Sequence, residues 1–298
     1  MPPVIASIPS PSSGFFEVGP LDIHMYGLML LLAIAVCIVV TGLRWTRNPE
    51  GGDWDLLLRI AVWGVAAGIV GARAYHVVTS WSEVPDPKWQ GVFMVWKGGL
   101  GVWGGILLGT LVGAYICKRA GKSPFVLMDA AAPGLMLAHG VGRVGNWWNQ
   151  ELFGEPTGRP WGLEIEPENR PFEYATAETF HPTFLYELLY VTAAAILLLV
   201  LDRFIRFRPP ALFALYVMLY TFGRFFEELL RIDPSHELGP LRLNAWVSIV
   251  VFILATAFFV YWQLLRGRPR RLRRERGREA HKDAPAMAIP KGRVRPPR

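Results

Sequence analysis

The chain has 298 residues, of which 52% are hydrophobic and 18% are charged, and its formal net charge is +7 at pH 7. Soluble domains carry about 25% charged residues. The composition therefore excludes an ordinary soluble domain and favours an integral membrane protein.

An extracytoplasmic segment is expected over residues 1–24, which contain no Lys or Arg and are rich in Pro and Ser. A signal peptide would begin with a basic region, and this segment does not. We therefore expect it to remain part of the protein, as an N-terminal segment outside the membrane.

Seven membrane-spanning helices are predicted within residues 25–265, because a helix needs about 20 residues to cross a bilayer. Three of these spans contain no charged residue: Met25–Leu43, Gly98–Cys117 and Leu243–Leu265. The other four contain charged residues: Leu57–Val78, Phe125–Val141, Pro182–Leu201 and Leu212–Leu230. The predicted fold class is an all-α integral membrane protein with seven transmembrane helices.

The orientation follows from the basic loops, because loops rich in Lys and Arg stay cytoplasmic. Segments 117–123 and 202–210 are basic, and from Arg266 onward there are 13 Lys and Arg against 3 Asp and Glu. We therefore predict an N-terminus outside and a C-terminus in the cytoplasm. The tail, 266–298, is expected to be disordered and to contact anionic membrane lipids. It lacks the interleaved aromatic residues that stack on bases, so no nucleic-acid partner is expected.

No cofactor or metal site is predicted. Cys37 and Cys117 fall inside hydrophobic spans and have no partner at metal-ligand spacing. The chain also lacks a nucleophile elbow, a phosphate-binding glycine loop and a dinucleotide fingerprint.

Polar residues at membrane depth are candidate site residues, because a charge near the bilayer centre costs about 2.5–3.5 kcal/mol. One group lies in "GRVGNWWNQELFG", 142–154, which contains Arg143, Asn146, Asn149 and Glu151. Its glycines, Gly142, Gly145 and Gly154, would permit close backbone approach. A polar turn anchored by tryptophans at the membrane surface is the alternative interpretation.

A second group lies in "YTFGRFFEELLR", 220–231. At about 100° per residue, Tyr220, Arg224, Glu228 and Arg231 fall within about 80° of one another on a helix. Arg143 and Arg224 should reach the outer face at the same depth, and no acidic excess stands beside Arg143 in the sequence. Because paired guanidinium groups suit phosphate, we predict an anionic ligand. Mutual neutralisation of Arg224 and Glu228 remains open.

These motifs resemble those of the bacterial prolipoprotein diacylglyceryl transferases. Their signature reads roughly G-R-x-G-N-[aromatic]-x-N-x-E-x-x-G, and segment 142–154 is similar to it at every fixed position. Four further segments are similar to family motifs: "HMYGLM" (24–29), "GARAYHV" (71–77), "HPTFLYE" (181–187) and "YTFGRFFEELLR" (220–231). The resemblance covers about residues 20–265.

The resemblance implies an enzyme of the bacterial plasma membrane whose active site faces outward. It would transfer the diacylglyceryl group of phosphatidylglycerol to the lipobox cysteine thiol of a prolipoprotein and release glycerol phosphate. The catalytic residues would be Arg143, Arg224, Tyr26, Glu151 and His181. Substrate-binding residues would be Asn146, Asn149, Gly154, Tyr220, Glu228 and Gly142. A lipid or anion transporter with an outward-facing arginine site is the alternative, although transporters usually carry inverted repeats.

The chain departs from the family pattern at Trp103. Many family members carry a histidine in this Gly-rich motif, where it has been proposed as the general base for the thiol, and indole cannot accept a proton usefully. The acceptor could instead be Glu151, the substrate phosphate or one of His24, His76, His139 and His181. For Arg73 and Asp129, an internal charge pair and a substrate contact both remain open.

Overall fold

The computed structural model describes residues 7–19, 21–233, 235 and 237–266. Most of this part of the chain is helical. Its seven long helices are α1 (Met25–Trp45), α2 (Trp54–Thr79), α4 (Val102–Arg119), α5 (Pro124–Trp148), α6 (Thr183–Phe204), α7 (Ala211–Leu230) and α8 (Leu243–Phe259). A π-helical segment, Val260–Leu265, continues α8.

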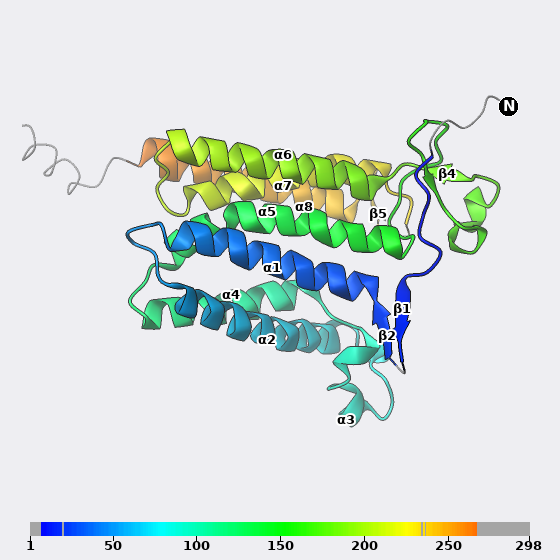
Figure 1. The fold of residues 1–298 in the computed structure, drawn as a ribbon, viewed down its shortest axis with the longest axis horizontal. Coiled ribbons are helices and arrows are strands. Elements are labelled where there is room, and N and C mark those ends of the chain that lie inside the picture. The colour runs from blue at the N-terminus through cyan, green and yellow to red at the C-terminus, as the bar shows by residue number, and fades with distance from the viewer. Residues whose placement is uncertain (1–6, 20, 234, 236, 267–298) are drawn as a thin grey trace, which may run out of the picture.

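The long helices lie side by side along one axis, and successive helices run in opposite directions (Figure 1). Helix α1 packs along α5, and α2 packs along α4. In this view, helices α6, α7 and α8 lie on the side of α5 that is opposite α1. Residues distant in sequence therefore meet wherever α5, α6 and α7 end together.

Three short antiparallel hairpins gather at one end of the bundle, which we call the hairpin end (Figure 1). They are β1 (Phe15–Val18) with β2 (Leu21–His24), β3 (Leu163–Glu164) with β4 (Thr179–Phe180), and β5 (Glu237–Leu238) with β6 (Leu241–Arg242). The short helix α3 (Lys88–Gly91) also lies there. The opposite end, which we call the turn end, holds the short links between α1 and α2, α4 and α5, and α6 and α7.

Five helical segments are long and apolar enough to cross a membrane among the described residues: α1, α2, α5, α6 and α8 with its π-helical extension. Large apolar side chains are exposed along the helices, including Leu31, Val62, Leu111, Leu189 and Ile253. Such a surface suits lipid rather than water. The class of a helical, multi-pass membrane protein is confirmed.

The predictions of seven spans and of an outside N-terminus stay predictions. Helix α4 ends in Lys118 and Arg119, and α7 contains three charged residues, Arg224, Glu227 and Glu228. Neither helix meets the criterion of length and apolar composition. The predicted disorder and lipid contact of the tail concern residues 267–298, which lie outside the described part of the chain.

The third predicted span begins later than its apolar run. The run starts at Gly98, whereas α4 starts at Val102. Gly98 and Gly99 have φ of 82° and 72°, values that residues other than glycine rarely adopt. Further along, a Cβ at Gly104 would lie 2.2 Å from the carbonyl oxygen of Gly71. These glycines thus let α4 start abruptly and touch the backbone of α2.

The largest core cluster joins α5, α6 and α7. Met136, Val191, Leu198 and Leu212 are almost fully buried within it. Burying such a side chain contributes about 1.5–3 kcal/mol in water, and tight packing keeps the helices in register within lipid. This core fixes the relative positions of the three helices that carry the polar groups at the hairpin end.

Candidate active site

The structure brings Arg143 of α5 and Arg224 of α7 to the same carboxylate. Glu227 Oε1 lies 3.6 Å from Arg143 Nη2, and Glu227 Oε2 lies 2.7 Å from Arg224 Nη1. Glu187 of α6 forms a second ion pair with Arg143, with its Oε2 at 2.5 Å from Nε. The four side chains form one cluster near the hairpin end of the bundle, in which the glutamates are buried and the arginines half-buried. We call it the arginine cluster.

Neither Glu187 nor Glu227 was among the predicted site residues. No acidic excess stands beside Arg143 in the sequence, but in the structure Glu187 reaches it from another helix. The i,i+3 spacing of Arg224 and Glu227 was a signal that could have identified Glu227. The arginines converge, but their charges are already balanced by carboxylates.

Glu228 forms ion pairs with Arg224 and with Arg242. Its Oε2 lies 2.6 Å from Arg224 Nη2, and its Oε1 lies 3.2 Å from Arg242 Nε. Asn244 Nδ2 also donates to Glu228 Oε1, at 3.4 Å. Because Glu228 is only 1% exposed, the geometry supports a role in positioning Arg224 rather than direct contact with substrate.

Arg231 and Arg242 converge on Asp233, just beyond α7. Arg231 Nε donates to Asp233 Oδ1 at 2.6 Å, and Arg242 Nη2 lies 3.0 Å from Oδ2. Burial acts to raise the pKa of Asp233, but the hydrogen bond from Arg231 and the two positive charges lower it overall. Asp233 therefore remains ionised and anchors the link between α7 and α8.

The predicted polar residues of the signature segment bind one another at the end of α5. Asn146 Nδ2 and Asn149 Nδ2 donate to Glu151 Oε1 at 2.8 and 3.0 Å. Arg143 Nη1 donates to Asn146 Oδ1 at 3.4 Å. Asn146 is thus the link between Arg143 in the arginine cluster and Glu151 at the protein surface.

Gln150 is a further residue of this turn that was not predicted. Its φ of 50° places it in the left-handed region, as does the φ of 59° at Leu152. The Gln150 side chain is buried, donates to the carbonyl of Pro11 at 2.9 Å and accepts from the amide of Glu166 at 2.8 Å. It holds the N-terminal segment and the 155–180 loop against the end of α5.

The glycines of the signature segment differ in their surroundings. A Cβ at Gly154 would lie 2.9 Å from the carbonyl oxygen of Leu230, so this glycine permits close approach to the end of α7. A Cβ at Gly145 would lie 2.8 Å from the ring of Tyr26, which places Tyr26 of α1 directly over α5. At Gly142 a Cβ would meet nothing within 4 Å. The prediction of close backbone approach therefore fails for Gly142 within this chain.

The candidate histidines occupy different environments. His139 Nε2 is 2.8 Å from the hydroxyl of Tyr216, and its ring stacks on Tyr220 with centroids 4.1 Å apart. His181 Nδ1 is 2.9 Å from the hydroxyl of Tyr186. His139 and Tyr220 thus form a half-buried aromatic stack, each about one helical turn before an arginine of the cluster. His181 lies at the hairpin end, where its carbonyl accepts from the amide of Gly154.

Arg73 and Asp129 form no ion pair among the described residues. Arg73 is buried and donates to the carbonyls of Gly91, Val92, Gly98 and Gly99 at distances from 2.5 to 3.0 Å. It thereby holds the loop between α2 and α4. Asp129 accepts from the backbone amide of Phe213 at 2.8 Å, near the start of α7. Of the two accounts left open, neither residue forms the internal charge pair in the described part of the chain, and both side chains bind the backbone.

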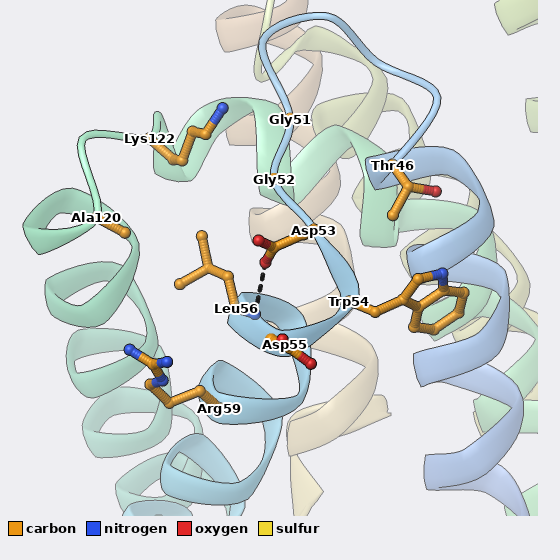
Figure 2. A pocket seen from close by; sticks show the side chains of 10 residues that line it. All are labelled: Thr46, Gly51, Gly52, Asp53, Trp54, Asp55, Leu56, Arg59, Ala120 and Lys122. Carbon is orange, nitrogen blue, oxygen red and sulfur yellow. Dashed lines mark hydrogen bonds between the residues drawn. The ribbon is translucent and has the colours of Figure 1, made fainter.

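A cleft of about 640 Å³ lies at the turn end, away from these residues. Among the residues that line this cleft, Asp53 accepts a hydrogen bond from the amide of Leu56 at the start of α2 (Figure 2). Arg59 and Lys122 also line the cleft. A smaller cleft of about 240 Å³ lies beside Asn149 and the N-terminal segment. The larger cleft contains none of the predicted site residues, so its size does not make it the active site.

Comparison with known proteins identifies a family. The model of the prolipoprotein diacylglyceryl transferase family matches residues 13–261. A phosphatidylglycerol–prolipoprotein diacylglyceryl transferase of Cutibacterium acnes is 45% identical over 259 residues, covering 86% of this chain and 87% of the relative. Proteins of the same name from Bifidobacterium adolescentis and Streptomyces griseus are 42% and 43% identical, and cover 87% and 86% of this chain and 81% and 78% of their own lengths.

Proposed function

Because the chain belongs to the prolipoprotein diacylglyceryl transferase family, we propose that it transfers the diacylglyceryl group of phosphatidylglycerol to a cysteine thiol of a prolipoprotein. The reaction forms a thioether and releases glycerol phosphate. The observation that carries the proposal at the level of geometry is the meeting of Arg143 and Arg224 around one carboxylate. A transporter is not favoured, because the matched relatives are named as transferases.

The chemistry explains why two guanidinium groups stand in a half-buried position. A thiolate attacks the glycerol carbon that bears the phosphate ester, and the C–O bond breaks. The departing phosphate gains negative charge as this bond breaks. Arginines fixed in a region of low dielectric stabilise that charge more strongly than water-exposed ones do.

We assign the remaining predicted residues by their contacts. Asn146 and Glu151 connect Arg143 to the surface beside Asn149, where the peptide or the glycerol headgroup would bind. Tyr26 and His181 stand at the same end of the bundle. Glu228 positions Arg224, and Tyr220 stacks on His139 one helical turn before Arg224. Gly154 lets the chain after α5 pass close to the end of α7. Gly142 leaves open space beside Arg143 for substrate.

The hairpin end is proposed to face the outside of the bacterial plasma membrane. The helix ends and links at the turn end contain many basic residues, among them Lys118, Arg119, Lys122, Arg203 and Arg206. Loops of this charge stay in the cytoplasm. The arginine cluster then lies near the outer leaflet, which is where a lipobox cysteine would meet phosphatidylglycerol.

The test is a transfer assay with purified protein, phosphatidylglycerol vesicles and a synthetic lipobox peptide. We expect the peptide to gain the mass of a diacylglyceryl group through a thioether. A peptide with Ser in place of the lipobox Cys is the control and should gain none. Purified folded protein that leaves the cysteine peptide unchanged would refute the proposal.

Trp103 is expected to be dispensable for catalysis. Its side chain is 58% exposed in the first turn of α4, and no hydrogen bond from it appears among the described residues. We expect Trp103→Phe to keep most of the transfer activity and to change the free energy of unfolding by no more than about 0.5 kcal/mol, as exposed substitutions do. The assay above and thermal unfolding measure both quantities.

Trp45→Phe provides a comparison for stability, because the Trp45 indole is fully buried at the turn end of α1. It should lower the unfolding temperature, whereas Trp103→Phe should not. Complete loss of transfer in Trp103→Phe would show that the indole participates in the reaction.

A further inference from the structure

The proposed reaction needs a proton acceptor for the thiol, and the arginine cluster contains acidic groups that the sequence analysis did not assign to this role. We propose that Glu227 accepts this proton and that it competes with the lipid phosphate for Arg143 and Arg224. The inference depends on the proposed function. It goes further by naming the base and by explaining why the two arginines are already paired.

Glu227 lies between the two arginines of the cluster. It is the carboxylate that contacts both arginines, one through each oxygen, at 3.6 and 2.7 Å. A phosphate that binds both guanidinium groups must therefore take over at least one contact of Glu227. When a buried carboxylate loses its cationic partners, it becomes a stronger proton acceptor. Substrate binding would thus create the base where the reaction takes place.

The neighbouring carboxylates are less suited to the role. Glu228 is held by Arg224, Arg242 and Asn244, and its side chain has no exposed surface. Glu187 pairs with Arg143 and does not contact Arg224 among the described residues. Glu227 keeps 8% of its side chain exposed and stands between the two guanidinium groups.

The other candidate groups are more distant from the arginines or are already bound. Nε2 of His139 is hydrogen-bonded to the hydroxyl of Tyr216, and the imidazole ring stacks on Tyr220. Glu151 is exposed and accepts from two asparagine amides. Neither contacts an arginine of the cluster in the described part of the chain, so neither would be released by the arrival of a phosphate.

Proton transfer to Glu227 would keep the charge at the site constant. A phosphodiester carries one negative charge, and the phosphate monoester that leaves carries close to two at neutral pH. In the step, the S–H proton moves to Glu227, sulfur bonds to the glycerol carbon, and the C–O electron pair stays with the departing phosphate. Glu227 loses one negative charge as the phosphate gains one. The arginines therefore face the same total charge before and after transfer, which avoids an uncompensated buried charge.

Glu227→Gln separates this role from folding. In this variant Arg143 still pairs with Glu187, and Arg224 still pairs with Glu228. The protein should therefore reach the membrane in normal amount. We expect kcat to fall by about 10²- to 10⁴-fold, the usual contribution of a general base. The KM for phosphatidylglycerol should stay the same or decrease, because a competitor for the arginines has been removed.

A peptide with selenocysteine at the lipobox position provides the second readout. A selenol ionises at lower pH than a thiol, so it depends less on a protein base. We expect this peptide to restore much of the rate lost in Glu227→Gln, which a structural defect would not permit. Glu151→Gln and His181→Gln serve as comparison variants. If either one, rather than Glu227→Gln, is rescued by the selenol, the base is that residue and the inference is overturned.

The wild-type protein gives an independent measurement. With the cysteine peptide, kcat should fall at acidic pH, where Glu227 is already protonated, and with the selenocysteine peptide this decrease should be much smaller. Equal decreases would contradict the inference even if Glu227→Gln did not accumulate. Wild-type protein that transfers no diacylglyceryl group would refute the proposed function, whereas active wild type with an equally active Glu227→Gln would refute only the role of Glu227.

Discussion

Replacing either arginine of the cluster with alanine is expected to remove most transfer activity. Arg143 and Arg224 supply the positive charge that faces the departing phosphate in the proposed reaction. Removal of one preorganised donor to a developing negative charge costs about 10²- to 10³-fold in kcat. The loss should appear in kcat as well as in the KM for phosphatidylglycerol, measured as thioether formed on the lipobox peptide.

Lysine at either position should recover only part of the activity. It restores the charge, but its single ammonium group cannot form the paired hydrogen bonds that a guanidinium fork makes with phosphate. Arg59→Ala is the matched control, because Arg59 is an exposed arginine on α2 at the turn end. This control should keep normal activity.

A double variant distinguishes lost chemistry from lost folding. Arg143→Ala alone leaves Glu187 buried without its cation, which costs about 3–5 kcal/mol. Arg143→Ala with Glu187→Ala removes both charges of that pair, so the protein should accumulate better than the single variant. We expect the double variant to remain inactive. A double variant that accumulates and turns over normally would remove Arg143 from the site.

The sequence predicted well which helices carry the polar site residues, because charge at membrane depth is rare and the polar residues of α7 recur with helical periodicity. It placed Arg143 and Arg224 near the same end of the bundle, where the structure brings them together. It could not predict which carboxylates meet them. Glu187 reaches Arg143 only because α5 and α6 pack side by side, and that contact depends on the whole core rather than on any local pattern.

Local backbone conformation was the second feature that the sequence concealed. Asn146 and Asn149 were expected to face a ligand, but the left-handed turn at Gln150 brings the Glu151 carboxylate back to both amides. Positive φ at Gln and Leu has no sequence signature of the kind that glycine provides. The late start of α4 was hidden in the same way, since Arg73 binds the loop carbonyls from another helix.

Glu228→Ala is expected to destabilise the protein. Glu228 is buried and compensates Arg224 on α7 and Arg242 at the start of α8. In this variant Arg224 keeps only Glu227, and Arg242 keeps only Asp233, as an ion-pair partner. The loss should therefore stay below the cost of about 3–5 kcal/mol for a buried charge without any partner. The unfolding temperature in detergent and the amount of protein in the membrane should both decrease.

The activity of the surviving Glu228→Ala protein should also decrease, because Arg224 loses the contact that holds its Nη2. Glu168→Ala is the control, since Glu168 is exposed in the loop between α5 and α6 and its removal should change stability by no more than about 0.5 kcal/mol. Comparison with Glu227→Gln separates the stabilising role of Glu228 from the catalytic role proposed for Glu227. Glu228→Ala should lower stability and activity together, whereas Glu227→Gln should lower kcat while the unfolding temperature stays close to that of the wild type. Equal unfolding temperatures for Glu228→Ala and the wild type would show that Glu228 does not support the fold through Arg224 and Arg242.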